Sequence, residues 1–205
     1  MADLRSICVY CGSNTGADPE YRQTAEALGK AMAEAGIRLV YGGGSVGLMG
    51  IVARTVLAHG GKVTGIIPQF LKDREVMLRE VTDLIVTDDM HDRKRIMFER
   101  SDAFVALPGG IGTLEEVVEM MTWAQLDQHE KPILIANING FWDPLISQFQ
   151  RMTDDKFLHK DFLGDHEDLP VRFCATFEEI IPTLQKAVAN VPRPSLEAGP
   201  SPDIV

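Results

Sequence analysis

The sequence of 205 residues has few cysteines, no long apolar run and no excess of positive charge. Its three cysteines are too few for the disulfide framework of a small secreted domain. No apolar stretch approaches the ~20 residues that a membrane-spanning helix needs. The apolar run Ile7–Tyr10 is too short for the core of a secretory signal. The sequence therefore predicts a cytoplasmic protein with no membrane partner.

The balance of charge argues against a nucleic-acid partner. Thirty acidic residues face 20 lysines and arginines, which gives a formal net charge of −10. A protein of this charge repels phosphate backbones at long range. A small phosphorylated ligand remains allowed, because donors at short distance outweigh the field of the whole chain.

Cys8 and Cys11 have the C-x-x-C spacing of redox and zinc motifs. The residues around them are typical of a strand, on which positions three apart face opposite sides and lie roughly 10 Å apart. That separation is too large for a disulfide, and no second pair completes a zinc site. We therefore expect two apolar thiols and neither a metal nor a redox cofactor.

Short apolar segments alternate with helical patterns along the chain. The pattern predicts strands at 6–10, 38–41, 62–67, 83–86, 103–107, 132–136 and 169–173. It predicts helices at 19–35, 47–59, 89–100, 113–126, 142–152 and 177–190. This order is typical of an α/β protein with a Rossmann-like, doubly wound parallel sheet that carries helices on both faces.

The alternation continues without a break, so residues 1–190 are predicted to form a single Rossmann-like domain. The composition then changes, and the last stretch contains Pro192, Pro194, Pro200 and Pro202. We expect residues 191–205 to be a disordered tail.

Three predicted strand-to-helix loops carry small residues, namely Gly12-Ser13, Gly42–Gly44 and Gly109–Gly112. In a doubly wound sheet these loops meet on one rim, where ligands bind. The third loop opens a helix, whose unpaired amides and partial positive charge suit a phosphate. It is neither a Walker loop nor G-x-G-x-x-G, so ATP and NAD are not favoured. The candidate ligand-binding residues on this rim are Ser13, Gly43, Gly44, Gly109, Gly110, Ile111, Gly112 and Thr113.

Two interpretations of Glu116 are open from the residues alone. Thr113 and Glu116 have the Thr-x-x-Glu spacing of a capping box, in which the glutamate only stabilises the helix start, by about 1 kcal/mol. Alternatively, Glu116 lies one turn from the phosphate loop and faces the same pocket. The core stripe of this helix is predicted to be Leu114, Val117, Val118 and Met121. A second line, Glu116, Met120, Trp123 and Asp127, suggests a pocket wall or a subunit interface.

Three segments together resemble a known family. They are Tyr41–Gly50 (YGGGSVGLMG), Met90–Lys94 (MHDRK) and Pro108–Glu116 (PGGIGTLEE). They are similar to the LOG ("Lonely Guy") family of cytokinin riboside 5′-monophosphate phosphoribohydrolases, long mislabelled as lysine decarboxylases. The resemblance extends over roughly Ile7 to Gln185, and the combination of P-G-G-x-G-T-x-x-E with the upstream Arg-Lys pair is highly specific.

The resemblance implies a dimer that hydrolyses the N-glycosidic bond of N6-substituted AMP, or of AMP itself, without a cofactor. The products are the free purine base and ribose 5-phosphate. The family's catalytic residues fall on Arg93 and Glu116. Further substrate contacts fall on Glu80, Lys94, Thr122 and the loop Gly109–Thr113. Ile111 stands where plant members usually carry tyrosine, so the preferred N6 group is not implied.

Cleavage of a ribosyl bond builds positive charge on the sugar, as in glycoside hydrolysis. An anionic Glu116 would stabilise that charge and activate water, whereas Arg93, a permanent cation, is a poor proton donor. One alternative is a non-catalytic nucleotide or cofactor carrier on the same fold, which would not require both residues. The decarboxylase alternative needs a Schiff-base lysine, and no lysine in the sequence is placed for that role.

Overall fold

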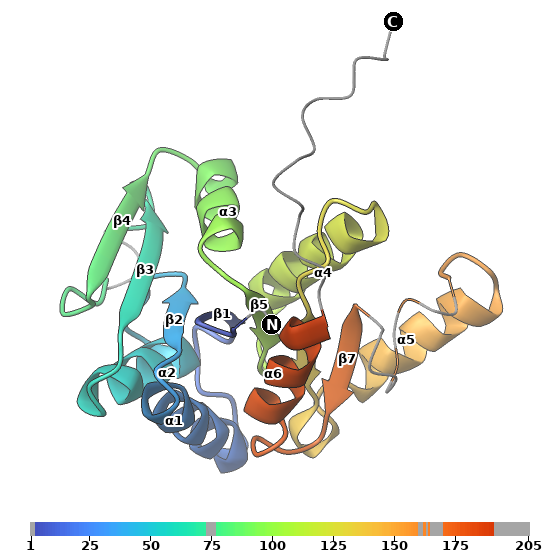
Figure 1. Cartoon of the computed structure of the whole chain (residues 1–205), viewed down its shortest axis with the longest axis horizontal. Helices are drawn as coiled ribbons and strands as arrows, with labels where there is room; N and C mark the ends of the chain where they lie inside the picture. The colour runs from blue at the N-terminus through green and yellow to red at the C-terminus, as the bar shows by residue number, and fades with distance from the viewer. Residues whose placement is uncertain (1–2, 73–76, 160–161, 163, 165–169, 191–205) are drawn as a thin grey trace, which may run out of the picture.

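The computed structural model describes residues 3–72, 77–159, 162, 164 and 170–190 (Figure 1). Within these residues one sheet of seven parallel strands has the order β4-β3-β2-β1-β5-β6-β7. The chain adds strands outward from β1 to β4, and then returns to place β5 on the other side of β1. The doubly wound topology is therefore confirmed. The strands are β1 Ser6–Tyr10, β2 Arg38–Tyr41, β3 Val63–Pro68, β4 Asp83–Thr87, β5 Ala103–Ala106, β6 Ile133–Ala136 and β7 Val171–Cys174.

Helices cover both faces of the sheet, and each face has its own hydrophobic core. Successive strand residues point to opposite faces, so Ile7 and Val9 join one hydrophobic cluster while Cys8 and Tyr10 join the other. Side chains of α1, α2 and α6 complete the first cluster, and those of α3, α4 and α5 complete the second. The helices are α1 Pro19–Glu34, α2 Gly47–Ala58, α3 Met90–Glu99, α4 Ile111–Gln125, α5 Asp143–Asp154 and α6 Ile180–Asn190, with a 3₁₀ turn at Ile138–Gly140.

The predicted elements agree with the observed ones, and most differences fall at their ends. The strands predicted at 6–10 and 38–41 match β1 and β2. Helix α4 begins at Ile111, two residues before the predicted start, and α6 begins at Ile180, three residues after it. The tail predicted at 191–205 lies outside the described residues.

The two cysteines of the C-x-x-C spacing face opposite layers, as the strand geometry predicts. Cys8 belongs to the cluster under α3, α4 and α5, and Cys11 to the cluster under α1, α2 and α6. Both thiols are buried and free, and burial raises the pKa of Cys8 to about 12. Among the described residues no group of three or more His, Cys, Asp or Glu could hold a metal ion. No helix in the described part of the chain is long and apolar enough to cross a membrane.

The outer face of α4 differs from the prediction. Met120 is only 1% exposed, because α4 packs against the sheet and α3 together, and Trp123 meets the ring of Phe98 edge-on at 5.3 Å. Met120 is therefore a core residue and not part of an outer wall, and Trp123 is half-buried against α3. Val118, predicted to be core, is 37% exposed.

Candidate active site

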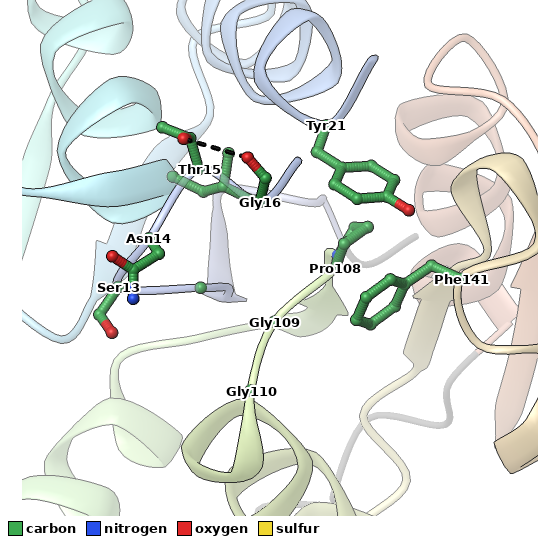
Figure 2. A pocket seen from close by; sticks show the side chains of 11 residues that line it. Ser13, Asn14, Thr15, Gly16, Tyr21, Pro108, Gly109, Gly110 and Phe141 are labelled. Atoms are coloured by element: carbon green, nitrogen blue, oxygen red, sulfur yellow. Dashed lines mark hydrogen bonds between the residues drawn. The ribbon is translucent and has the colours of Figure 1, made fainter. Parts of the chain in front are cut away.

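The winding of the sheet reverses between β1 and β5, which pair directly. In doubly wound sheets ligands bind in the crevice at this point. The amide of Gly12, after β1, donates to the carbonyl of Pro108, after β5, at 3.1 Å. A cavity of about 250 Å³ lies over these loops (Figure 2). Its lining consists of Gly12–Gly16, Tyr21, Leu48, Pro108–Gly110 and Phe141.

The cavity combines bare backbone with aromatic rings. Tyr21, from the first turn of α1, meets Phe141 edge-on with ring centroids 5.5 Å apart. Figure 2 shows Pro108 between the two rings, on the opposite side of the view from Ser13 and Asn14. Of the residues that line the cavity, the sequence analysis selected Ser13, which is exposed here, together with Gly109 and Gly110. Tyr21 and Phe141 carry no motif, and only the fold brings them to this loop.

A buried ion pair joins α3 to α4 near the same rim. Arg93 Nη1 lies 3.3 Å from Glu116 Oε1, and the two side chains are only 8% and 14% exposed. Arg93 also donates from Nε to the carbonyl of Ile66 at 3.2 Å. Buried charges are stable only when they are paired and hydrogen-bonded, so this geometry holds both side chains in place. The two predicted catalytic residues therefore lie together.

The start of α4 decides between the two interpretations of Glu116. The N-cap is Gly110, in an extended conformation with no side-chain cap, and the amide of Leu114 donates to its carbonyl at 3.0 Å. Thr113 is therefore inside the helix, and Glu116 is six residues past the cap. A capping box needs the glutamate three residues after the cap, so that interpretation is wrong. The side chain of Glu116 is instead available to Arg93.

The loop Gly109–Gly112 is open on its outer side. Among the described residues no heavy atom comes within 4 Å of a methyl group placed on Gly110 or Gly112, and Ile111 is 83% exposed. The first amides of a helix have no partner within it. Thr113 is buried, and a methyl group on Gly109 would overlap its hydroxyl. The loop can therefore present the amides of residues 111–113 to an anion.

The loop Gly42–Gly44 is closed by protein atoms. A methyl group on Gly42 would lie well inside 3.0 Å of Arg93 Nη2, and one on Gly43 would lie 3.1 Å from Ile67 Cβ. All three glycines are buried, and Gly44 pairs with Met77 in an isolated antiparallel bridge. The sequence analysis placed Gly43 and Gly44 with the ligand, whereas the structure packs them against β3 and the segment after it.

Lys94 makes a second link between α3 and α4. Its ammonium donates to Glu115 at 2.7 Å and to Glu119 at 2.9 Å. Partial burial acts to lower the pKa of Lys94, but the hydrogen bonds that it donates to the two carboxylates outweigh this effect and raise that pKa. The lysine is therefore a charged bridge beside the Arg93–Glu116 pair.

Two further candidates lie on the surface. Glu80 is exposed in a turn before β4. Thr122 is exposed on α4, and its hydroxyl donates to the carbonyl of Val118 at 2.8 Å. At 1.5 Å per residue Thr122 lies roughly 18 Å along α4 from Gly110. The structure thus brings Arg93, Glu116 and the start of α4 together and leaves Thr122 apart.

The chain is similar to known proteins over the part that contains Arg93, Glu116 and the loop Gly109–Gly112. A family model described as "Possible lysine decarboxylase" matches residues 49–172. The chain is 47% identical over 155 residues to a protein from Oryza sativa subsp. japonica named probable cytokinin riboside 5′-monophosphate phosphoribohydrolase LOGL1, covering 76% of this chain and 70% of that one. A protein from Arabidopsis thaliana named cytokinin riboside 5′-monophosphate phosphoribohydrolase LOG7 is 46% identical over 156 residues, covering 76% and 71%.

Solved structures share the fold at lower identity. The molybdenum cofactor carrier protein from Chlamydomonas reinhardtii has a TM-score of 0.67 at 22% identity, covering 92% of this chain and 99% of that one. The molybdenum cofactor binding protein from Rippkaea orientalis has a TM-score of 0.66 at 24% identity, covering 90% and 98%. At this identity the likeness concerns the fold alone.

Proposed function

The chain belongs to the LOG family, and from this membership we propose that it hydrolyses the N-glycosidic bond of nucleoside 5′-monophosphates. Its substrates are N6-substituted AMP, such as a cytokinin riboside 5′-monophosphate, and AMP itself. The products are the free purine base and ribose 5-phosphate. The observation that carries the proposal is the buried Arg93–Glu116 pair next to the open start of α4.

The proposed chemistry needs an anion at the sugar. As the bond from C1′ to the purine breaks, its electron pair leaves with the base, which takes up a proton from solvent, and C1′ becomes positive. Glu116 stabilises that charge and accepts a proton from the water whose oxygen bonds to C1′. Arg93 pairs with Glu116 in a buried position and can hold a sugar hydroxyl, but it does not donate the proton.

The phosphate fits the opposite end of the same site. In our proposal the amides of residues 111–113 and the Thr113 hydroxyl hold it at the positive end of α4. The glycines Gly110 and Gly112 leave room for it, Gly109 leaves room for the Thr113 side chain, and Ile111 is beside it. On the family resemblance we also assign substrate contacts to Glu80, Lys94 and Thr122, and from its place in the cavity we assign one to Ser13. Gly43 and Gly44 support the site from within the protein.

A lysine decarboxylase activity does not suit these residues. A Schiff-base lysine must lose its proton readily, which calls for a lowered pKa. Lys94, the lysine next to Arg93, is held by two carboxylates that raise its pKa. The described geometry therefore favours the hydrolase.

We also propose a homodimer formed through α4. Ile111, Val118 and Leu126 are exposed on one face of this helix, with Leu126 at 62%. Exposed apolar stripes of this kind are typical of interfaces. Light scattering should give twice the mass of the 22.6 kDa chain, and a monomer would contradict this assignment.

The three free, buried thiols fit the reducing cytoplasm, where we expect the protein.

The proposal is tested by Glu116→Gln, which keeps the shape of the side chain and removes its charge. Purified protein is incubated with AMP and with isopentenyladenosine monophosphate, and the free base is measured by chromatography. Since such groups contribute about 10²- to 10⁴-fold, kcat should fall at least about 100-fold while the KM changes little. Glu99→Gln, an exposed change at the end of α3, is the control and should keep wild-type activity. Wild-type turnover by Glu116→Gln would overturn the assignment.

A further inference from the structure

The guanidinium of Arg93 is enclosed by protein groups. Its Nε donates to the carbonyl of Ile66, on β3, at 3.2 Å. Its Nη1 contacts the thioether of Met90 at 3.8 Å and Glu116 Oε1 at 3.3 Å. Its Nη2 lies against the backbone of Gly42, at the end of β2. The direction in which Nη1 points therefore depends on the space available to Nη2.

Gly42 provides that space because it has no side chain. A methyl group on Gly42 would occupy the position of Nη2, and its next neighbour, Met49 Sδ, would lie at an ordinary 3.6 Å. The backbone of Gly42 does not need glycine, because its φ is not positive, unlike that of Gly43 at 81°. The requirement for glycine at this position is therefore a requirement for room beside Arg93.

We propose that Gly42 is a positioning residue, which sets the orientation of Arg93 toward Glu116, and that it makes no contact with the ligand. The inference rests on the proposed hydrolase function, since Arg93 and Glu116 are the acting pair there. It assigns a role to the Gly42–Gly44 loop that differs from a phosphate loop. In this role the loop leaves space for the guanidinium of Arg93, which lies 51 residues further along the chain than Gly42.

The Gly42→Ala variant separates this role from a structural one. The overlapping atom is the end of a flexible side chain, so the protein should fold and Arg93 should turn away. We expect kcat to fall at least about 10-fold, with a smaller change in KM, in a protein that remains folded. Gly65→Ala is the control, because its methyl group would touch Gly43 Cα, in the same loop, at 3.2 Å, and none of its three nearest atoms belongs to Arg93. That variant disturbs the same loop without reaching Arg93 and should keep most of the activity.

A double-mutant cycle with Arg93→Lys supplies the decisive comparison. Lysine has no second terminal nitrogen, so it does not need the space beside residue 42. Gly42→Ala should therefore lower kcat strongly in the wild-type background and hardly at all in the Arg93→Lys background. An equal loss in both backgrounds, or full activity of Gly42→Ala, would overturn the proposal.

A measurement without substrate keeps this inference distinct from the proposed function. The Nε–H of Arg93 is buried and hydrogen-bonded, so it should give a protected NMR signal that Arg93→Lys removes. Gly42→Ala should shift or broaden that signal, and Gly65→Ala should leave it in place. An unchanged signal in Gly42→Ala overturns the positioning role. Absence of base release by the wild-type protein overturns the hydrolase while the NMR result still decides the role of Gly42.

Discussion

Two glycine-rich loops lie on the same rim of the sheet and look alike in the sequence, but the structure uses them in different ways. In Gly42–Gly44 the spaces beside Gly42 and Gly43 are filled by Arg93 and Ile67. In Gly109–Gly112 the spaces beside Gly110 and Gly112 are open. Glycine makes room for protein atoms in the first loop, whereas in the second loop no atom of the described residues fills the space beside Gly110 or Gly112. A run of glycines therefore does not by itself indicate a phosphate site.

The Arg93–Glu116 pair connects the two loops. Arg93 rests on the closed loop, whereas Glu116 belongs to the helix that the open loop begins. Substitutions in the closed loop should therefore act on folding or on the orientation of Arg93. Substitutions in the open loop should act on ligand binding.

Gly47→Ala, just beyond the closed loop, should destabilise the protein strongly. Gly47 has φ 60°, and a methyl group on it would lie well inside 3.0 Å of the backbone of Ser13 and Asn14. The positive φ strains any residue with a side chain at position 47, and the backbone of Ser13 and Asn14 cannot move away without a large energetic cost. We therefore expect a loss of about 3 kcal/mol or more in the free energy of unfolding. Urea unfolding followed by circular dichroism measures this change.

The control for this prediction is Gly60→Ala. Gly60 has a similar φ of 76°, but among the described residues no heavy atom lies within 4 Å of its added methyl group. It should cost only the backbone strain, about 1 to 2 kcal/mol. Equal losses in the two variants would contradict the view that this region is closed by packing.

The sequence alone predicts the doubly wound fold and the convergence of the loops, because period and loop composition are local properties. It does not show which loop is open, because the atom that fills the space beside Gly42 comes from Arg93, on a different helix. It also leaves the role of Glu116 ambiguous. The Thr-x-x-Glu spacing suggests a helix that starts at Thr113, whereas α4 begins at Ile111. Tyr21 and Phe141 are missed because only tertiary folding places them beside Pro108.

Gly112→Ala, in the open loop, should have a smaller effect and change stability and binding in opposite directions. Gly112 is the second residue of α4, and alanine favours a helix by roughly 0.5 to 1 kcal/mol over glycine. The added methyl group lies beside the amides proposed to hold the phosphate. We therefore expect a slightly higher melting temperature and a KM for AMP raised about 10-fold, measured by calorimetry and by steady-state kinetics.

Gln125→Ala, an exposed change at the other end of α4, is the control and should leave the KM unchanged. A Gly112→Ala protein with wild-type KM would mean that this loop does not hold the substrate. The open loop would then resemble the closed one in function, and the comparison between them would fail.

The far end of α4 is fixed by a neutral histidine. The Nδ1 of His129 accepts from the amide of Lys131 at 3.1 Å, which leaves the hydrogen on Nε2 to donate to the carbonyl of Met120, on α4, at 3.0 Å. Burial is the main cause that lowers the pKa of His129, and the charge of Lys131 adds to it. A second proton on Nδ1 would break the bond to Lys131.

The smallest expected effect is a loss of stability in mild acid that comes from this histidine. Because its pKa is lower in the folded protein, the unfolded chain binds the proton first as the pH falls below about 6.5, and the free energy of unfolding decreases. The contribution is complete above that pH and is lost on acidification toward the lowered folded value. Urea midpoints at pH 7.5 and 5.5 should therefore differ more for the wild type than for His129→Gln, whose amide can still donate to Met120. The control is His159→Gln, at an exposed position, which should behave like the wild type. The same pH dependence in all three proteins would show that the stability of α4 does not depend on His129.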